Sequence, residues 1–276
     1  MTALVLENVW KEYDDQIVLE NLSLTIAPRS FVALVGPSGC GKSTLLRLLL
    51  GQEQVTRGAI TLDGTPLPNE PGQDRGVVYQ RYSVFPHLTV LGNVMLGPEL
   101  RAGRISGRSW GRARRQLAES ARQMIADVGL AGSEEKYPAQ LSGGMQQRLA
   151  LAQALMMQPR VLLLDEPFGA LDPGIRTDIH HLMKRLWHAL PMTVVMVTHD
   201  LREAFTLATR VVALGRTRNR PEEVARYGAF ITKDIEIWPP RVAGGGSIYT
   251  VDYALGWDDP TLHAATSGRP DPQTET

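Results

Sequence analysis

The stretch that decides the fold is GPSGCGKS at residues 36–43, which directly follows the apolar run FVALV at residues 31–35. The apolar run is β-branched enough to predict a central, buried parallel strand. The residues that follow, STLLRLLL at 43–50, predict a helix with an apolar face that ends at Gly51. A strand, a glycine loop and a helix in this order form a cradle for an anion, because the loop N–H groups and the positive end of the helix dipole converge on one point.

The side chains of this loop indicate which anion it binds. Lys42 can reach the β- and γ-phosphates of a nucleotide, and the Ser43 hydroxyl suits Mg²⁺. The alternative is a glycine turn in an unrelated α/β protein, but the pattern G-x-x-x-x-G-K-[ST] in this setting favours the nucleotide. The residues that we expect to hold it are Gly36, Pro37, Ser38, Gly39, Cys40, Gly41, Lys42, Ser43 and Thr44.

Composition limits the class of protein. Of the 276 residues, 43% are hydrophobic and 21% are charged, which is ordinary for a soluble globular protein. Lys+Arg and Asp+Glu balance at 29 each, so the charge gives no reason to expect nucleic acid as a partner. No apolar run approaches the ~20 residues that span a bilayer, and the first residues lack the apolar core of a signal peptide, so we expect an intracellular protein.

The single cysteine, Cys40, excludes an internal disulfide and lies within the glycine loop. A thiol beside a lysine at a helix start can have a lowered pKa, which would make it reactive. The other interpretation, which we favour, is a small residue that fits the loop.

Two further apolar runs end in groups that suit phosphate chemistry. VLLLDEP at 161–167 predicts a buried strand that ends in two carboxylates, and neighbouring strand residues point to opposite sides. We assign Asp165 to Mg²⁺ and Glu166 to the general base that activates water. A strand over 193–198 ends at His199, the position where ligands lie in open α/β sheets, so His199 can contact the γ-phosphate. The alternatives are a solvent-exposed strand end and a structural histidine.

A second helix start of the same kind is LSGGMQQR at 141–148. Ser142 is a natural N-cap, and glycines occupy the next two positions. The glycine loop already holds one nucleotide, so this second cradle needs a nucleotide from elsewhere.

Five motifs occur in one order: GPSGCGKST, LSGGMQQR, VLLLDEP, ALD and VTHD. With them the chain resembles, over roughly residues 3–215, the nucleotide-binding subunit of an ATP-binding-cassette (ABC) transporter. The layout is most similar to the nitrate/sulfonate/taurine importer family. The resemblance implies ATP and Mg²⁺ as cofactors and a head-to-tail homodimer, in which each ATP lies between the glycine loop of one copy and the LSGG of the other.

The resemblance also implies roles for single residues. Tyr13 matches the aromatic residue that stacks on adenine, and Gln80 matches the glutamine that touches Mg²⁺ and the attacking water. His199 matches the switch histidine, and Asp172 matches the aspartate that crosses the dimer interface. The residues that match the binders of the partner's γ-phosphate are Ser142, Gly143 and Gly144.

The chain departs from the family pattern at positions that do not touch the phosphates. Arg29 stands where the family usually has glycine, Gln153 replaces a frequent arginine, and Thr209 replaces a frequent aspartate. Catalysis is therefore not in doubt, but the turn near residue 29 can differ in geometry.

The expected fold is α/β, a P-loop NTPase core with a mostly parallel sheet, an N-terminal antiparallel β subdomain and an inserted α-helical subdomain. The ATPase domain would span 1–214, with the insertion at 81–158. Residues 215–276 would form a partly disordered C-terminal extension without a second folded domain. Within it the aromatic residues of 248–257 are spaced four apart, so this segment either docks as a short ordered element or is disordered.

Three features have a plain interpretation beside a functional one. The arginine-rich stretch 101–118 is either a solvated loop leading into a helix or a contact for lipid headgroups or the permease. The segment around Phe85 mixes aromatic and polar residues, and we expect it to line a groove for a short permease helix. We interpret His180, His181 and His188 as surface or packing histidines, because no carboxylate or cysteine completes a metal-ligand spacing.

The resemblance implies the function of an ATPase subunit that powers an importer for a small polar solute, of the nitrate/sulfonate/taurine type or a urea- or guanidine-type nitrogen compound. Its partners would be a second copy, transmembrane permease subunits and, indirectly, an extracytoplasmic substrate-binding protein. It would lie peripherally on the cytoplasmic face of the membrane. The alternatives are the ATPase of another ABC importer class or of an exporter, and a soluble ABC protein outside transport.

Overall fold

The decisive strand lies in the middle of a six-stranded sheet. The computed structural model describes residues 4–68, 70–80, 83–102, 111–216, 218, 223 and 226–237, all within the compact unit Met1–Pro240. The strand order is β10-β9-β3-β8-β7-β6, and neighbouring strands from β9 to β6 are parallel. All residues of β3 are buried, as a parallel strand covered on both faces requires. The strands are β3 (Phe31–Val35), β6 (Arg75–Val78), β7 (Val161–Asp165), β8 (Thr193–Val197), β9 (Arg210–Gly215) and β10 (Phe230–Glu236).

The N-terminal residues form a separate antiparallel sheet with the order β2-β1-β4-β5. Apolar and polar residues alternate in β1 and β2, so one face of this sheet joins the hydrophobic core. Its strands are β1 (Leu4–Tyr13), β2 (Gln16–Ile26), β4 (Arg57–Leu62) and β5 (Thr65–Pro66). The predicted antiparallel β subdomain is confirmed.

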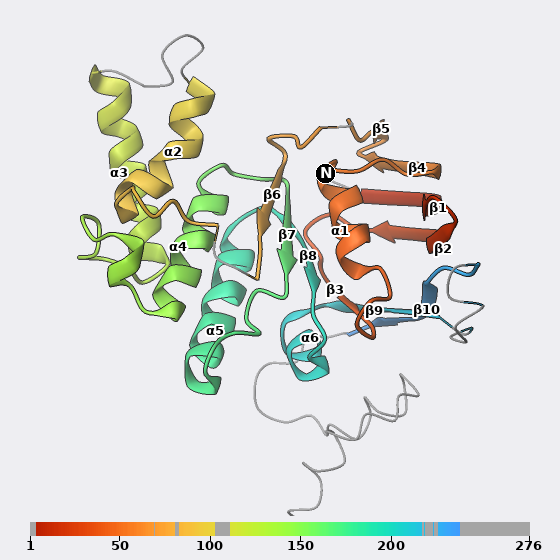
Figure 1. The fold of residues 1–276 in the computed structure, drawn as a ribbon. Coiled ribbons are helices and arrows are strands. Elements are labelled where there is room, and N and C mark those ends of the chain that lie inside the picture. The colour runs from red at the N-terminus through yellow and green to blue at the C-terminus, as the bar shows by residue number, and fades with distance from the viewer. Residues whose placement is uncertain are drawn as a thin grey trace, which may run out of the picture. The chain divides into compact units, whose positions relative to one another are not determined.

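The helices divide into those that follow core strands and those inserted between β6 and β7. Figure 1 shows the inserted helices grouped beside β6 and β7, on the side away from the N-terminal sheet. The inserted elements are α2 (Val90–Ala102), α3 (Gly111–Asp127), the 3-10 helix η1 (Pro138–Gln140) and α4 (Gly143–Leu155). The core helices are α1 (Lys42–Leu50), α5 (Pro173–Ala189) and α6 (Leu201–Leu207). The α/β fold with a helical insertion is therefore confirmed.

The core sheet continues past residue 214, where the sequence placed its end. The last strand, β10, pairs antiparallel with β9, and the Arg210 guanidinium donates to both carboxylate oxygens of Asp234 at 2.7 and 2.6 Å. Ala229 also bonds through its backbone with Val18 and Glu20 of β2. The extension thus contributes one strand to the core, while the segment 248–257 lies outside the described residues.

At two positions where the sequence departs from the family pattern, Arg29 and Thr209, the surrounding residues accommodate the change. Arg29 adopts the left-handed conformation, with φ of 59°, that glycine would adopt at no steric cost, and its N–H donates to Thr193 Oγ1 at 3.0 Å. The turn is therefore kept despite the arginine. The Thr209 hydroxyl donates to the Phe31 carbonyl oxygen at 3.0 Å and so ties β3 to the start of β9.

Within the part of the chain that the structure describes, no helix is both long and apolar enough to cross a membrane. The centre of the arginine-rich stretch, 103–110, lies outside that part. Of its flanking arginines, Arg114 on α3 pairs with Glu99 on α2 at 3.3 Å and is otherwise exposed.

Candidate functional site

The glycine loop has the backbone that a phosphate cradle requires. Gly36, Gly39 and Gly41 have φ of 156°, 77° and 100°. A Cβ at Gly36 would overlap the Leu214 carbonyl oxygen, and one at Gly41 would lie 2.7 Å from Leu19 Cδ2. A side chain at Gly36 or Gly41 would collide with Leu214 or Leu19, and Gly39 has open space but a left-handed φ that glycine adopts at no steric cost. The loop backbone therefore favours glycine at all three positions.

Lys42 is the first residue of α1, directly after this loop, and is only 6% exposed. Its ammonium donates to the carbonyl oxygens of Gly36 at 2.6 Å and of Pro37 at 3.0 Å. An ammonium has three donors, and here the loop satisfies it with two neutral acceptors. A buried cation held by neutral carbonyl oxygens fits a polyphosphate, which would supply the matching negative charge.

The thiol of Cys40 is 3% exposed and lies against Gly36. Burial raises its pKa, and the nearby charge of Lys42 opposes this without reversing it. A reactive thiol with a lowered pKa is therefore the wrong interpretation, and Cys40 is a small residue that fits the loop.

The carboxylates of Asp165 and Glu166, at the end of β7, point in directions that strand alternation does not explain. Asp165 is the last residue of β7, whereas Glu166 has left the strand with a left-handed φ of 45° and donates its N–H to the Val197 carbonyl oxygen at 2.9 Å. Strand alternation alone does not set the direction of Glu166. Burial raises the pKa of Asp165, as does the charge of Glu166, while Arg47 and Lys42 lower it. A divalent cation beside Asp165 would relieve this unfavourable burial of negative charge.

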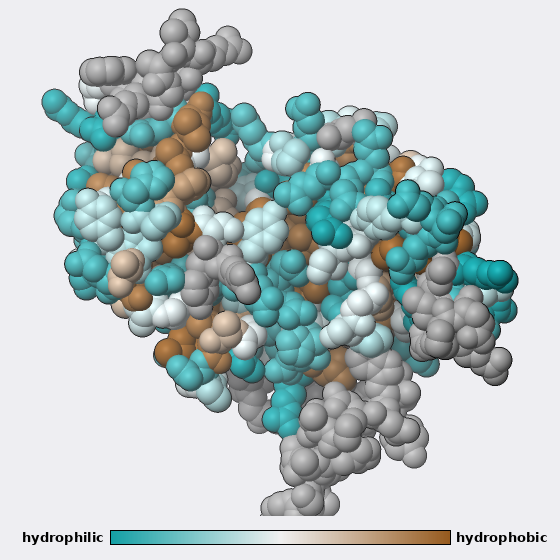
Figure 2. Space-filling model, in the orientation of Figure 1, coloured by the Kyte–Doolittle hydropathy of each residue, from teal (hydrophilic) through white to brown (hydrophobic). Residues whose placement is uncertain are grey.

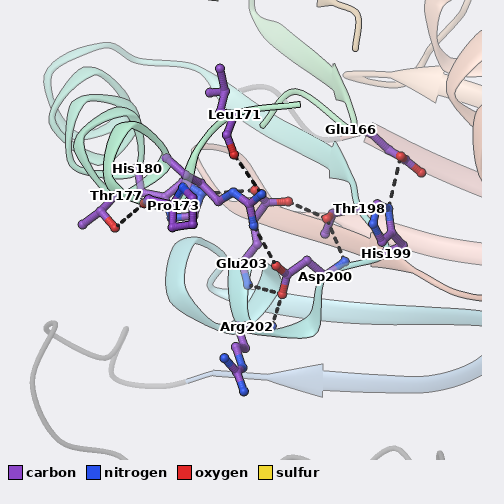
Figure 3. A network of polar contacts seen from close by, with 11 residues as sticks. Glu166, Leu171, Pro173, Thr177, His180, Thr198, His199, Asp200, Arg202 and Glu203 are labelled. Atoms are coloured by element: carbon purple, nitrogen blue, oxygen red, sulfur yellow. Dashed lines mark hydrogen bonds and ion pairs between the residues drawn. The ribbon is translucent and has the colours of Figure 1, made fainter. Parts of the chain in front are cut away.

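The three residues predicted to be catalytic lie together. His199 Nδ1 is 3.1 Å from Glu166 Oε2 (Figure 3). A Cβ placed on Gly169 would lie 3.8 Å from Gln80 Nε2 and 4.0 Å from His199 Cε1, so Gln80 and His199 border the same space. The imidazole is 61% exposed, which leaves it accessible to a ligand.

A polar network behind His199 was missed by sequence reasoning (Figure 3). The Thr198 hydroxyl donates to buried Glu203, whose other oxygen lies 3.1 Å from His180 Nε2. Asp200 caps α6 by accepting the N–H of Glu203 at 3.2 Å and of Arg202 at 2.8 Å. An N-cap is readable from sequence, but the pairing of His180 with a residue 23 positions away is not.

Arg176 on α5 joins this network to the loop that carries Asp172. Its guanidinium lies 3.4 Å from the Asp200 carboxylate and donates to the Leu171 carbonyl oxygen at 3.1 Å. Asp172 occupies the N-cap position of α5 but makes no capping bond with its side chain, and it is exposed. Its carboxylate is thus available to a group outside this helix.

The start of α4 is built differently from the glycine loop. The Ser142 hydroxyl accepts the Met145 N–H at 3.4 Å, as predicted for an N-cap, and a Cβ on Gly144 would lie 2.5 Å from Ile175 Cγ2. Ser142 and Gly143 are exposed. In Figure 1 α4 and α1 lie apart, with β6 and β7 between them in view, so the two helix starts do not form one site within this chain.

The glycine cradle, its buried lysine, the strand-end carboxylates and the histidine define a nucleotide-binding cassette of the α/β class. The sequence matches the ABC transporter family over residues 19–169. The structure resembles a dimeric bacterial ABC transporter cassette with a TM-score of 0.69 and 30% identity, over 85% of this chain and 98% of that one. The same cassette in a post-hydrolysis state bound to ADP and Pi gives a TM-score of 0.66. This chain belongs to the ABC transporter family.

Two curated relatives are import ATP-binding proteins. The sulfate/thiosulfate import ATP-binding protein of Mycobacterium bovis is 41% identical over 78% of this chain and 60% of its own length. The spermidine/putrescine import ATP-binding protein of Acetivibrio thermocellus is 40% identical over 79% of this chain and 61% of its own length. This chain thus spans about three fifths of the relatives that it matches.

ATP with Mg²⁺ is the cofactor of this family, and the residues present fit it. The glycine cradle and Lys42 would hold the phosphates, and Ser43 with Asp165 would hold the metal. Among the described residues, no cluster of three or more His, Cys, Asp and Glu side chains could hold a metal ion.

Proposed function

We propose that this chain is the ATP-hydrolysing subunit of a membrane importer for a small polar solute, of the nitrate/sulfonate/taurine type or a urea- or guanidine-type nitrogen compound. The observation that carries the hydrolysis is the contact between Glu166 and His199 beside the cradle, with Gln80 bordering the same space. Import is supported by the names of two relatives, a sulfate/thiosulfate and a spermidine/putrescine import ATP-binding protein.

The proposed reaction needs positioning and charge stabilisation more than covalent chemistry. The Glu166 carboxylate accepts the proton of the attacking water, and His199 fixes the orientation of that carboxylate through the 3.1 Å contact. Gln80 orients the water and the metal shell, while Lys42 and the loop N–H groups stabilise the charge of the leaving phosphates. Tyr13 stacks on the adenine.

The proposed assembly is a head-to-tail homodimer. Ser142, Gly143 and Gly144 start a helix that is remote from their own cradle, and Asp172 leaves its carboxylate unused for capping. In the proposed dimer these groups meet the nucleotide and the loops of the second copy.

The proposed permease contact lies on the helical insertion, at the cytoplasmic face of the membrane. Of the large apolar side chains exposed in the described chain, Phe85, Leu100 and Tyr137 belong to the stretch between β6 and α4. Figure 2 shows apolar surface among polar residues over these helices. A cavity of about 310 Å³ beside β6 is lined by Tyr79 and Met157, among others. A permease and an extracytoplasmic binding protein encoded beside this chain would support import.

The hydrolysis is tested by Glu166→Gln. The variant keeps the volume and the metal ligand Asp165 but cannot accept a proton, so we expect turnover to fall by ~10²–10⁴ while ATP affinity is kept. Phosphate release and nucleotide titration measure the two quantities, and a sizing column shows whether ATP then traps a closed dimer.

The matched control is Glu119→Gln, which neutralises an exposed carboxylate on α3 and should leave both quantities unchanged. Near-normal hydrolysis by Glu166→Gln would remove Glu166 from the role of general base.

A further inference from the structure

Glu53, in the loop after α1, bonds to side chains from two separate elements. It accepts the phenol hydroxyl of Tyr13 and lies 3.3 Å from the Lys11 ammonium, both on β1. Its second carboxylate oxygen is 2.8 Å from Arg47 Nε on α1. The Glu53 side chain is 22% exposed, so the solvent screens these contacts only in part. One carboxylate thus links the end of β1 to α1, the helix that directly follows the phosphate cradle.

Lys11 also restricts the ring of Tyr13. Its ammonium lies 4.6 Å from the centre of the ring and makes a cation–π contact with one face, and it donates to the Gln54 carbonyl oxygen at 3.0 Å. Tyr13 as a whole residue is 38% exposed. A planar group that stacks on Tyr13 must therefore use the face that Lys11 does not occupy.

Arg47 connects this ring to the cradle itself. It donates to Thr44 Oγ1 at 3.3 Å, and Thr44 lies two residues after Lys42 in the same helix. The base and the phosphates of a nucleotide are joined covalently, so the distance between them is limited. A stacking ring that is anchored to the phosphate-binding helix is held within that distance of the phosphates. A ring on an untethered strand end would have to be ordered on binding, which lowers the affinity.

The ionisation of the cluster supports this arrangement. Burial raises the pKa of Glu53, but the hydrogen bonds from Tyr13 and Lys11 and the charges of Arg47 and Lys11 outweigh it and lower the pKa overall. Burial and the Glu53 carboxylate raise the pKa of Tyr13. At neutral pH the carboxylate is therefore ionised and the phenol is a proton donor, so their hydrogen bond is charge-assisted.

We propose that Glu53 is a positioning residue for the nucleobase: it fixes the ring of Tyr13 relative to α1, and with Lys11 it presents one ring face for stacking. The inference rests on the proposed function, because it takes Tyr13 as the residue on which the base of ATP stacks. It adds the group that orients this ring and the side from which the base approaches.

The test compares two ligands with the same triphosphate, Mg-ATP and Mg-tripolyphosphate, on the intact chain. Tyr13→Ala should weaken ATP binding about 5- to 150-fold, the range expected for a lost base–aromatic stack. Glu53→Ala should weaken it about two- to tenfold, the equivalent of one net hydrogen bond. Both variants should leave tripolyphosphate affinity unchanged, so the ratio of the two affinities falls.

Glu53→Gln keeps an acceptor for the phenol and should restore most of the ratio, which a role in general stability would not predict. The matched control is Glu12→Ala, which removes a neighbouring carboxylate that pairs with Arg57 instead and should not change the ratio. Thermal unfolding of each variant identifies any loss of folded protein.

The outcomes separate the inference from the function beneath it. Equal weakening of both ligands by Glu53→Ala would overturn the inference, because Glu53 would then act on the cradle as a whole. A lower ratio in Tyr13→Ala but not in Glu53→Ala would also overturn it while leaving Tyr13 as the stacking residue. An unchanged ratio in Tyr13→Ala would refute the stacking itself, and hydrolysis by the same protein would still test the ATPase separately.

Discussion

The glycine loop before α1 and the start of α4 use small residues before a helix in the same way, yet they differ in completeness. In the first, glycines surround a buried Lys42, and the carboxylate of Asp165 is close enough to respond to its charge. In the second, Ser142 caps its own helix and Gly144 packs on Ile175, while the outward surface is exposed. A helix start with small residues is therefore a whole site only when other elements close around it, and in the proposed dimer a second chain would close around the start of α4.

The largest effect should come from the complete site. Lys42→Ala removes a charged donor that no other described group of the loop replaces. Hydrogen bonds to charged groups contribute about 1.5–3 kcal/mol, so ATP affinity should fall about 10- to 150-fold. Turnover should fall by a further ~10²–10³ if the ammonium also stabilises the transition state. Nucleotide titration and phosphate release measure both, with exposed Lys136→Ala as the control. Unchanged affinity would place the nucleotide elsewhere.

The incomplete site should show the opposite pattern. Ser142→Arg fills the exposed start of α4, so hydrolysis should fall by about 10² while the affinity of the single chain for ATP is kept. Loss of ATP binding in this variant would contradict the assignment to a second copy.

A mixture of Ser142→Arg and Lys42→Ala subunits sharpens the comparison. In the mixed dimer both defects fall on one site and the other is intact, so part of the activity should return. Mixing that restores no activity would argue that each site is complete within one chain.

Gly144 should matter for stability. A Cβ there would lie 2.5 Å from Ile175 Cγ2, and overpacking of this kind costs about 1–3 kcal/mol. Thermal unfolding of Gly144→Ala should therefore show Tm lowered by about 2–12 °C. The control is Gly174→Ala on α5, where an added Cβ meets nothing within 4 Å and Tm should be unchanged or higher. Equal behaviour of the two variants would show that α4 and α5 yield easily at this contact.

The smallest effect should be at Cys40. Burial raises the pKa of its thiol, so the reactive thiolate is scarce at neutral pH. The thiolate becomes populated only at a pH above the ordinary pKa of a cysteine. Iodoacetamide should thus modify the folded chain more slowly than the unfolded chain at pH 7.5, as mass spectrometry can follow. Rapid modification of the folded chain at that pH would contradict the buried position.

Sequence predicted the parts of the fold that depend on short local patterns of residues. The run 31–35, the glycine spacing after it and the alternation of the N-terminal strands each specify their element within a few residues. The meeting of Glu166 and His199 followed because the carboxyl ends of parallel strands meet at one edge of a sheet, whereas the role of Gln80 was expected only from the family resemblance.

The parts that sequence missed depend on distant contacts. Tyr13 and Glu53 are 40 positions apart, and no local pattern marks their pairing. The placement of β10 on the edge of the core sheet depends equally on β9 being available there. The direction of the Cys40 pKa shift depends on burial, which outweighs the neighbouring charge that the sequence does show.

The backbone on both sides of His199 is fixed by hydrogen bonds, so only the side chain of His199 is free to rotate. The Thr198 hydroxyl has one proton, which it donates to Glu203, so its oxygen is left to accept the Asp200 N–H at 3.0 Å. Asp200 is also fixed by capping α6. The Cα of His199 is therefore held in place while its imidazole is exposed. A change of partner away from Glu166 needs only rotation about the χ1 and χ2 bonds of one side chain, which is a ps–ns event for exposed residues and requires no movement of the sheet.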